Sequence, residues 1–121
     1  MIDYLAISQG NCLAFRVSGK VSLEQEQHWI SELQKVIDEH GRIRIMMILE
    51  DGAHWGFQAG IEDLKFALKH SKEFDKIAVI SDSQVMRWLV SIDDFFASFL
   101  NISEKHFLPQ QQAEAWDWLQ S

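Results

Sequence analysis

The stretch "LEDGAHWGF", Leu49 to Phe57, has the residue types that acid–base chemistry would need. The carboxylate of Glu50 or Asp51 could orient the imidazole of His54, a group that titrates near neutral pH. The stretch has no Ser, Thr or Cys to act as a nucleophile, and Asp-Gly is also a common turn sequence. A small hydrolase or isomerase that uses Asp51 and His54 is therefore the alternative hypothesis. The simplest interpretation is a strand-to-helix turn with no ligand, and the next is a binding rim that contacts a ligand through Glu50, Asp51, His54 and Trp55.

A second polar junction, "SDSQ", follows another apolar run and contains Ser81, Asp82 and Ser83. Backbone N–H groups at a helix N-terminus can bind an anion, so these three residues are candidate ligand contacts. A helix N-cap accounts for the same residues without a ligand. Ser81 and Ser83 could also accept a phosphate.

Neither a metal nor a cofactor is expected. The five histidines lie in five separate elements, and no two have the i, i+4 spacing of a helical metal site. Cys12 is the only cysteine, so one chain can form neither a disulfide nor a thiolate zinc site. Gly52, Gly56 and Gly60 are spaced too widely for a phosphate-binding loop.

The elements that would position these residues alternate along the chain. Two strand-like runs, "IDYLAIS" and "CLAFRVS", flank the turn sequence "QGN" and predict a hairpin. Ser22 and Gln25 have capping-box spacing before an amphipathic helix that ends near Gly41. "IRIMMIL" predicts a strand buried on both faces. Phe57, Ile61, Leu64 and Leu68 recur at helical spacing and predict a second helix to about Ser71.

The rest of the chain continues the alternation. "KIAVI" predicts a buried strand, "VMRWLVSIDDFFASFL" a third helix, "EKHFL" a short strand and the segment after Pro109 a final helix. Strands that alternate with helices favour an α/β fold with a mainly parallel sheet, to which the N-terminal hairpin adds an antiparallel edge. Ligands of such sheets usually lie beyond the carboxyl ends of the strands, where both polar junctions fall.

The third predicted helix is apolar on more than one side. Trp88 and Phe95 form a second stripe beside the residues that can face the sheet. A second apolar stripe needs a second partner, which could be the final helix with Trp116, another subunit or an apolar ligand. Trp88 and Phe95 are therefore candidate interface residues.

Composition limits the class of protein. The 121 residues suit one domain, residues 1–121, and 47% apolar with 24% charged residues is ordinary for a globular protein. A net charge of −7 disfavours nucleic acid and anionic membranes as partners. No apolar run is long enough to cross a bilayer, and the N-terminus does not look like a signal peptide. We expect a cytoplasmic protein without a membrane span.

Several phrases together resemble the SpoIIAA-like family, in the STAS-fold group related to anti-sigma-factor antagonists. They are "LAFRVSGKVS", "IRIMMILED", "DLKFALKHSKEFDKIAVISD" and "AWDWL". The resemblance implies a mixed, mainly parallel sheet with about four helices, no cofactor and a binding or interaction role. STAS antagonists are switched by a phosphorylated serine after the middle strand. The matching stretch, residues 50–70, has no Ser or Thr, so that switch does not carry over.

The predicted function is a non-enzymatic binding or interaction module. Its expected partner is a second copy of the chain, as a homodimer. A small amphipathic or lipid-like ligand is the other possibility, since the fold group includes relatives that bind such molecules.

Overall fold

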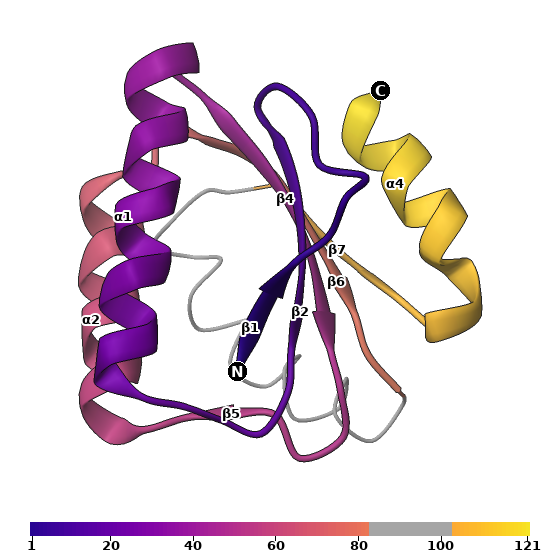
Figure 1. The fold of residues 1–121 in the computed structure, drawn as a ribbon. Coiled ribbons are helices and arrows are strands. Elements are labelled where there is room, and N and C mark those ends of the chain that lie inside the picture. Colours follow the sequence, from indigo (N-terminus) through magenta and orange to yellow (C-terminus); the bar gives the residue numbers. More distant parts are fainter. Residues whose placement is uncertain (83–102) are drawn as a thin grey trace.

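A computed structural model describes residues 1–82 and 103–121 (Figure 1). The third predicted helix lies outside the described residues, and with it Ser83, Trp88 and Phe95. The part described holds three α-helices, against the four expected from the whole sequence.

A five-stranded sheet forms the centre of the fold, in the order β1-β2-β4-β6-β7. Its strands are β1 (Ile2–Tyr4), β2 (Cys12–Val17), β4 (Ile43–Leu49), β6 (Phe74–Ile80) and β7 (Ser103–Phe107). The pairs β2–β4, β4–β6 and β6–β7 are parallel, whereas β1 runs antiparallel to β2. The predicted mixed, mainly parallel sheet with an N-terminal hairpin is confirmed.

Helix α1 (Leu23–His40) begins and ends as its sequence predicts. The Ser22 hydroxyl accepts from the Gln25 backbone N–H at 3.2 Å, and the Gln25 side chain accepts from the Ser22 N–H at 3.1 Å. This capping box satisfies two backbone donors that the helix itself leaves free. The helix ends at Gly41, whose φ of 78° is a conformation that glycine adopts without strain.

Helix α2 (Phe57–Lys69) forms where the spacing of its apolar residues predicts it. Those residues are nevertheless not the ones that pack on the sheet. Ala59 and Phe66 are buried, and they lie on the opposite side of the helix from Phe57, Ile61, Leu64 and Leu68. We call the four residues Phe57, Ile61, Leu64 and Leu68, which face away from the sheet, the apolar face of α2.

Two short strands lie beneath the first turns of α1 and α2. β3 (Lys20–Val21) pairs in parallel with β5 (His54–Trp55), so that Lys20 is opposite His54 and Val21 opposite Trp55. Gly52 has a φ of 82°, which turns the chain from β4 into β5. The stretch "LEDGAHWGF" is therefore a turn followed by a strand, and Gly56 is the N-cap of α2.

The sheet is covered on both faces (Figure 1). Helices α1 and α2 lie on one side, over a core built around Phe15, Trp29 and Phe66. The final helix lies on the other side, where α4 (Gln112–Gln120) follows a 3₁₀ turn at Pro109–Gln111. Its Ala115, Trp116 and Leu119 belong to a second core with Met46 and Phe107.

Candidate functional site

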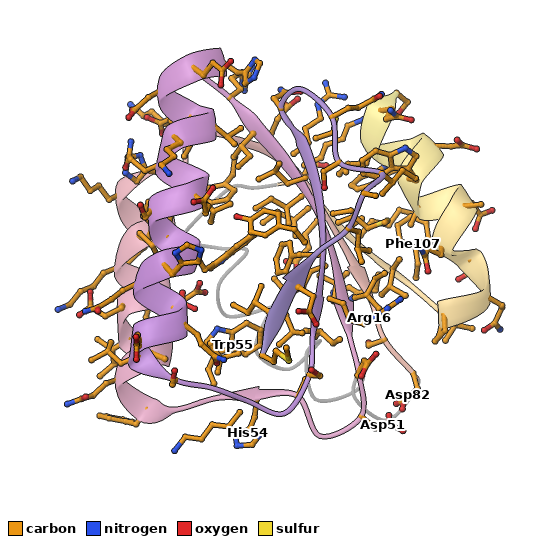
Figure 2. The ribbon with its side chains drawn as sticks, in the orientation of Figure 1. Arg16, Asp51, His54, Trp55, Asp82 and Phe107 are labelled. Atoms are coloured by element: carbon orange, nitrogen blue, oxygen red, sulfur yellow. The ribbon has the colours of Figure 1, made fainter. Side chains whose placement is uncertain are left out.

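The ends of β4 and β6 bring two carboxylates together (Figure 2). Because these neighbouring strands are parallel, Asp51 and Asp82 follow them at the same edge of the sheet. Their side chains are hydrogen-bonded to each other, and this bond, together with the negative charge of Asp82, raises the pKa of the exposed Asp51. Two predicted site residues from separate junctions thus meet.

Glu50 points to a different partner at the same edge. Its Oε1 lies 3.3 Å from Nε of Arg16 on β2, and both side chains are about half exposed. Exposed ion pairs of this kind contribute little to stability because water and salt screen them. Glu50 therefore offers a carboxylate that is already balanced by a cation.

His54 is not oriented by Asp51. Its Nδ1 lies 2.8 Å from the Gly52 carbonyl oxygen, and the exposed ring stands apart from the Asp51–Asp82 pair (Figure 2). A general base needs a partner within hydrogen-bonding reach, and Asp51 is instead bonded to Asp82. The geometry of the described residues thus gives the hydrolase or isomerase hypothesis no support.

Ser81 lies inside the protein. It is fully buried, its backbone N–H donates to the Phe107 carbonyl at 3.1 Å, and its hydroxyl has no hydrogen-bond partner among residues 1–82 and 103–121. A ligand or a kinase could not reach this hydroxyl in the conformation described. Asp82 is partly buried beside it, and Ser83 lies outside the described residues.

Trp55 is tied to the core by a group that the sequence analysis did not single out. Its indole Nε1 donates to Oε2 of Glu26 on α1 at 3.0 Å. Glu26 is 0% exposed, and its carboxyl is also hydrogen-bonded to Asp63 on α2. Trp55 thus links β5 to α1, and the Glu26–Asp63 pair links α1 to α2.

The environment of this pair favours the neutral form of one carboxyl. Burial raises the pKa of Glu26 to about 10, and the hydrogen bond and charge of Asp63 add to the effect. Burial also raises the pKa of Asp63, whereas the hydrogen bond from Glu26 lowers it. We therefore place the shared proton on Glu26 at neutral pH. A signal was present in the sequence, since Glu26 occurs at helical spacing from Trp29, Leu33 and Ile37.

Three of the large apolar side chains that are exposed in the described residues lie on α2. Phe57 is 84% exposed, Leu68 50% and Ile61 38%. Single exposed apolar residues are ordinary, but a row of them along one helix typically marks a contact surface.

The described residues offer neither a metal site nor a membrane-spanning helix. No group of three or more His, Cys, Asp and Glu side chains could hold a metal ion in the part described. Within the same residues, no helix has both the length and the hydropathy needed to cross a membrane.

Comparison with known proteins gives a family and a solved structure of similar fold. The SpoIIAA-like family model matches residues 12–120. A similar solved structure is that of an uncharacterised protein of the DUF3478 family with a SpoIIAA-like fold, from Shewanella loihica PV-4. It is 26% identical, with a TM-score of 0.75 over 98% of this chain and 93% of that one. No curated protein matches. The family match over most of the chain, together with the shared fold, shows that this protein belongs to the SpoIIAA-like family.

Proposed function

We propose that this protein is a non-enzymatic interaction module and that its contact surface is the apolar face of α2. The observation that carries the proposal is the exposure of Phe57, Ile61 and Leu68 on a helix that already buries its opposite side. Exposed apolar area costs free energy in water, which a partner can recover by covering it. Glu50 at the sheet edge is already balanced by Arg16, so it supports binding less well.

The favoured partner is a second copy of the chain. The spacing of Phe57, Ile61, Leu64 and Leu68 is four, three and four, which is the same in both directions along the helix. Two antiparallel α2 helices related by a two-fold axis would therefore place Phe57 against the partner's Leu68 and Ile61 against the partner's Leu64. Gly60 and Ala67 border the face on one side, and such small residues allow a second helix to approach closely.

The test is native mass spectrometry of gently purified protein at concentrations up to about 100 µM, because dimerisation follows mass action. We expect a dimer mass without adduct. Phe57→Ser and Leu68→Ser should each shift the equilibrium toward monomer by at least about tenfold, since each removes roughly 1–3 kcal/mol of apolar burial per subunit. Phe57 is too exposed in the monomer for its loss to unfold the chain.

Gln58→Ser is the matched control, because Gln58 is exposed on the same helix turn but lies outside the apolar face. It should leave the dimer intact. A wild-type protein that is monomeric and free of adduct at the highest concentration would contradict the proposal. If the protein is instead monomeric and carries a reproducible small-molecule adduct, its partner is an amphipathic or lipid-like ligand and not a second copy of the chain.

A further inference from the structure

The sheet separates two apolar cores, which have no residue in common in the part of the chain described. The first core lies under α1 and α2 and contains Leu13 and Phe15 of β2. The second lies under α4 and contains Cys12 and Ala14, whose side chains alternate with those two along the strand. Packing that is confined to one face of a sheet can be lost while the other face keeps its own. The cover of the second core can therefore open separately.

Helix α4 is the cover of this second core. Within residues 1–82 and 103–121 it is the one α-helix on its side of the sheet (Figure 1). It has nine residues, and the three that it buries are Ala115, Trp116 and Leu119. A helix of this length is not stable in water by itself, so its structure depends on its contact with the sheet. Undocking and unfolding of α4 are consequently one event.

The last turn of α4 is held by polar contacts near the surface. Nζ of Lys76 on β6 donates to the Trp118 carbonyl at 3.0 Å and to the Ser121 carbonyl at 2.9 Å. The same ammonium lies 5.1 Å from the centre of the partly exposed Trp118 ring, and the ammonium of Lys105 on β7 lies 6.0 Å from it. Water can satisfy these carbonyls once the helix leaves, so the loss of the contacts does not disturb the strands.

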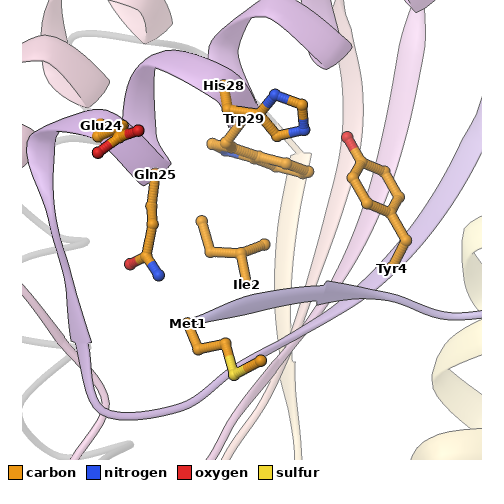
Figure 3. A pocket seen from close by; sticks show the side chains of 7 residues that line it. All are labelled: Met1, Ile2, Tyr4, Glu24, Gln25, His28 and Trp29. Atoms are coloured by element: carbon orange, nitrogen blue, oxygen red, sulfur yellow. The ribbon is translucent and has the colours of Figure 1, made fainter.

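The first core is covered more firmly. Figure 3 shows the Ile2 and Tyr4 side chains of β1 on the same side of the strand, toward Trp29 on α1. The ring centres of Tyr4 and Trp29 are 5.8 Å apart, those of Phe15 and Trp29 are 3.8 Å apart, and a hollow of about 360 Å³ remains beside them. Helix α1 has 18 residues and is thus joined both to the middle of the sheet and to its edge. We therefore expect it to stay in place when α4 leaves.

We propose that α4 is a lid that opens independently of the rest of the fold and uncovers an apolar face of the sheet. Met46, Ile80 and Phe107 belong to that face, which α4 keeps out of water when it is closed. Cys12 lies beside the end of the lid, because it is opposite Arg44, whose guanidinium donates to the Leu119 carbonyl at 2.8 Å. The lid lies across the sheet from α2, so it opens whether or not the apolar face of α2 forms a dimer.

The single cysteine of the chain makes the opening measurable. Cys12 is 8% exposed when the lid is closed, and its reaction with 5,5′-dithiobis(2-nitrobenzoate) can be followed in a series of urea concentrations below the unfolding transition. Opening of a nine-residue helix exposes little surface. The logarithm of the labelling rate should therefore rise with urea at less than about half the slope of global unfolding, measured by circular dichroism. Without urea, labelling should be at least about tenfold faster than global unfolding allows.

Matched variants on the two faces separate the lid from the rest of the fold. Leu119→Ala on α4 should speed labelling without urea by at least about tenfold, whereas Leu33→Ala makes the same change in the first core and should leave it unchanged. Lys76→Met is a milder variant that should speed labelling about fivefold, although the Lys76 charge lowers the pKa of the thiol and its loss alone would slow the reaction. A slope equal to that of global unfolding, or labelling that Leu119→Ala and Lys76→Met leave unchanged, would overturn the proposal. So would equal acceleration by Leu119→Ala and Leu33→Ala.

Discussion

Glu26 shows how one buried acid can join three elements. Its carboxyl accepts from the Trp55 indole and shares a proton with Asp63, so β5, α1 and α2 meet at a single side chain. A buried polar group must be hydrogen-bonded to be tolerated, and a buried charge costs far more. Of the two, the neutral acid is therefore the form that suits this site.

The protonation of Glu26 predicts a pH-dependent stability of defined sign. Its pKa is about 10 in the folded protein, against an ordinary value of 4.5, so between these values the folded state binds more protons than the unfolded state. The free energy of unfolding therefore falls as pH rises from about 4.5 toward 10. Glu26→Gln keeps an acceptor for Trp55 and a donor for Asp63 without the titration. We expect the variant to be similar to wild type at pH 5 and more stable than it at pH 9, by up to about 5 kcal/mol, because almost the whole interval lies between the two pKa values.

Urea denaturation at pH 5, 7 and 9 would measure this difference. Glu24→Gln is the control, because it makes the same substitution at an exposed position two residues away on α1. Its profile should follow that of wild type. A Glu26→Gln curve that stays parallel to the wild-type curve over the whole range would contradict the proposed protonation.

At the scale of elements, α1 depends on its capping box. Ser22 and Gln25 exchange hydrogen bonds of 3.2 and 3.1 Å before the first turn. Ser22→Ala removes the acceptor for one of the free backbone donors and should cost about 1 kcal/mol of stability. Ser31→Ala, at an exposed position in the middle of the same helix, should be neutral or slightly stabilising because alanine favours helices. Urea denaturation of both variants would test this, and equal effects would argue against a role for the cap.

The sequence predicts those features of the fold that depend on neighbouring residues, and it does not predict those that depend on contacts between distant residues. The cap of α1, its end at Gly41 and the strands β4 and β6 are signalled by neighbouring residues, and each forms as predicted. The side of α2 that packs on the sheet depends instead on Ala59 and Phe66 meeting α1 and the sheet, which spacing alone does not reveal. β3 and β5 are two residues each, too short to show alternation.

In the candidate site, too, some features follow from the order of the strands and others depend on local geometry or distant contacts. That Asp51 and Asp82 lie at one edge follows from the strand order, since β4 and β6 are parallel neighbours. That their carboxyls bond to each other, leaving His54 to the Gly52 carbonyl, depends on turn geometry set by the positive φ of Gly52. Glu26 was missed because a carboxylate on the apolar side of a helix is usually solvated, and its burial requires Trp55 and Asp63 from elsewhere in the chain.

At the scale of the whole molecule, the two faces of the sheet are held in different ways. α1 and α2 pack over a broad apolar core, joined by the Glu26–Asp63 pair. α4 buries only one short row of residues, Ala115, Trp116 and Leu119. Two cationic side chains from the sheet donate hydrogen bonds to carbonyl groups in its last turn. Arg44 on β4 donates to the Leu119 carbonyl at 2.8 Å, and Lys76 on β6 donates to the Trp118 carbonyl at 3.0 Å.

These two cations come from neighbouring positions, because Arg44 and Lys76 are directly opposite each other in the β4–β6 ladder. Positive charge at a helix C-terminus is favourable for carbonyls that have no partner within the helix, and Asp75 fixes the Arg44 guanidinium at 2.7 Å. Arg44→Met keeps the length of the side chain and removes the donors. We expect the amides of residues 112–120 to exchange at least about tenfold faster, since a charged hydrogen bond contributes roughly 1.5–3 kcal/mol.

Hydrogen exchange with mass spectrometry would compare peptides from α4 with peptides from α1 in the same sample. The amides of α1 should keep their protection, because α1 packs on the other side of the sheet. Arg42→Met is the matched control, since Arg42 reaches Asp75 at 3.7 Å but no hydrogen bond joins it to α4 among the described residues. Faster exchange throughout the chain, or the same loss in both variants, would mean that Arg44 supports the sheet as a whole rather than the docking of α4.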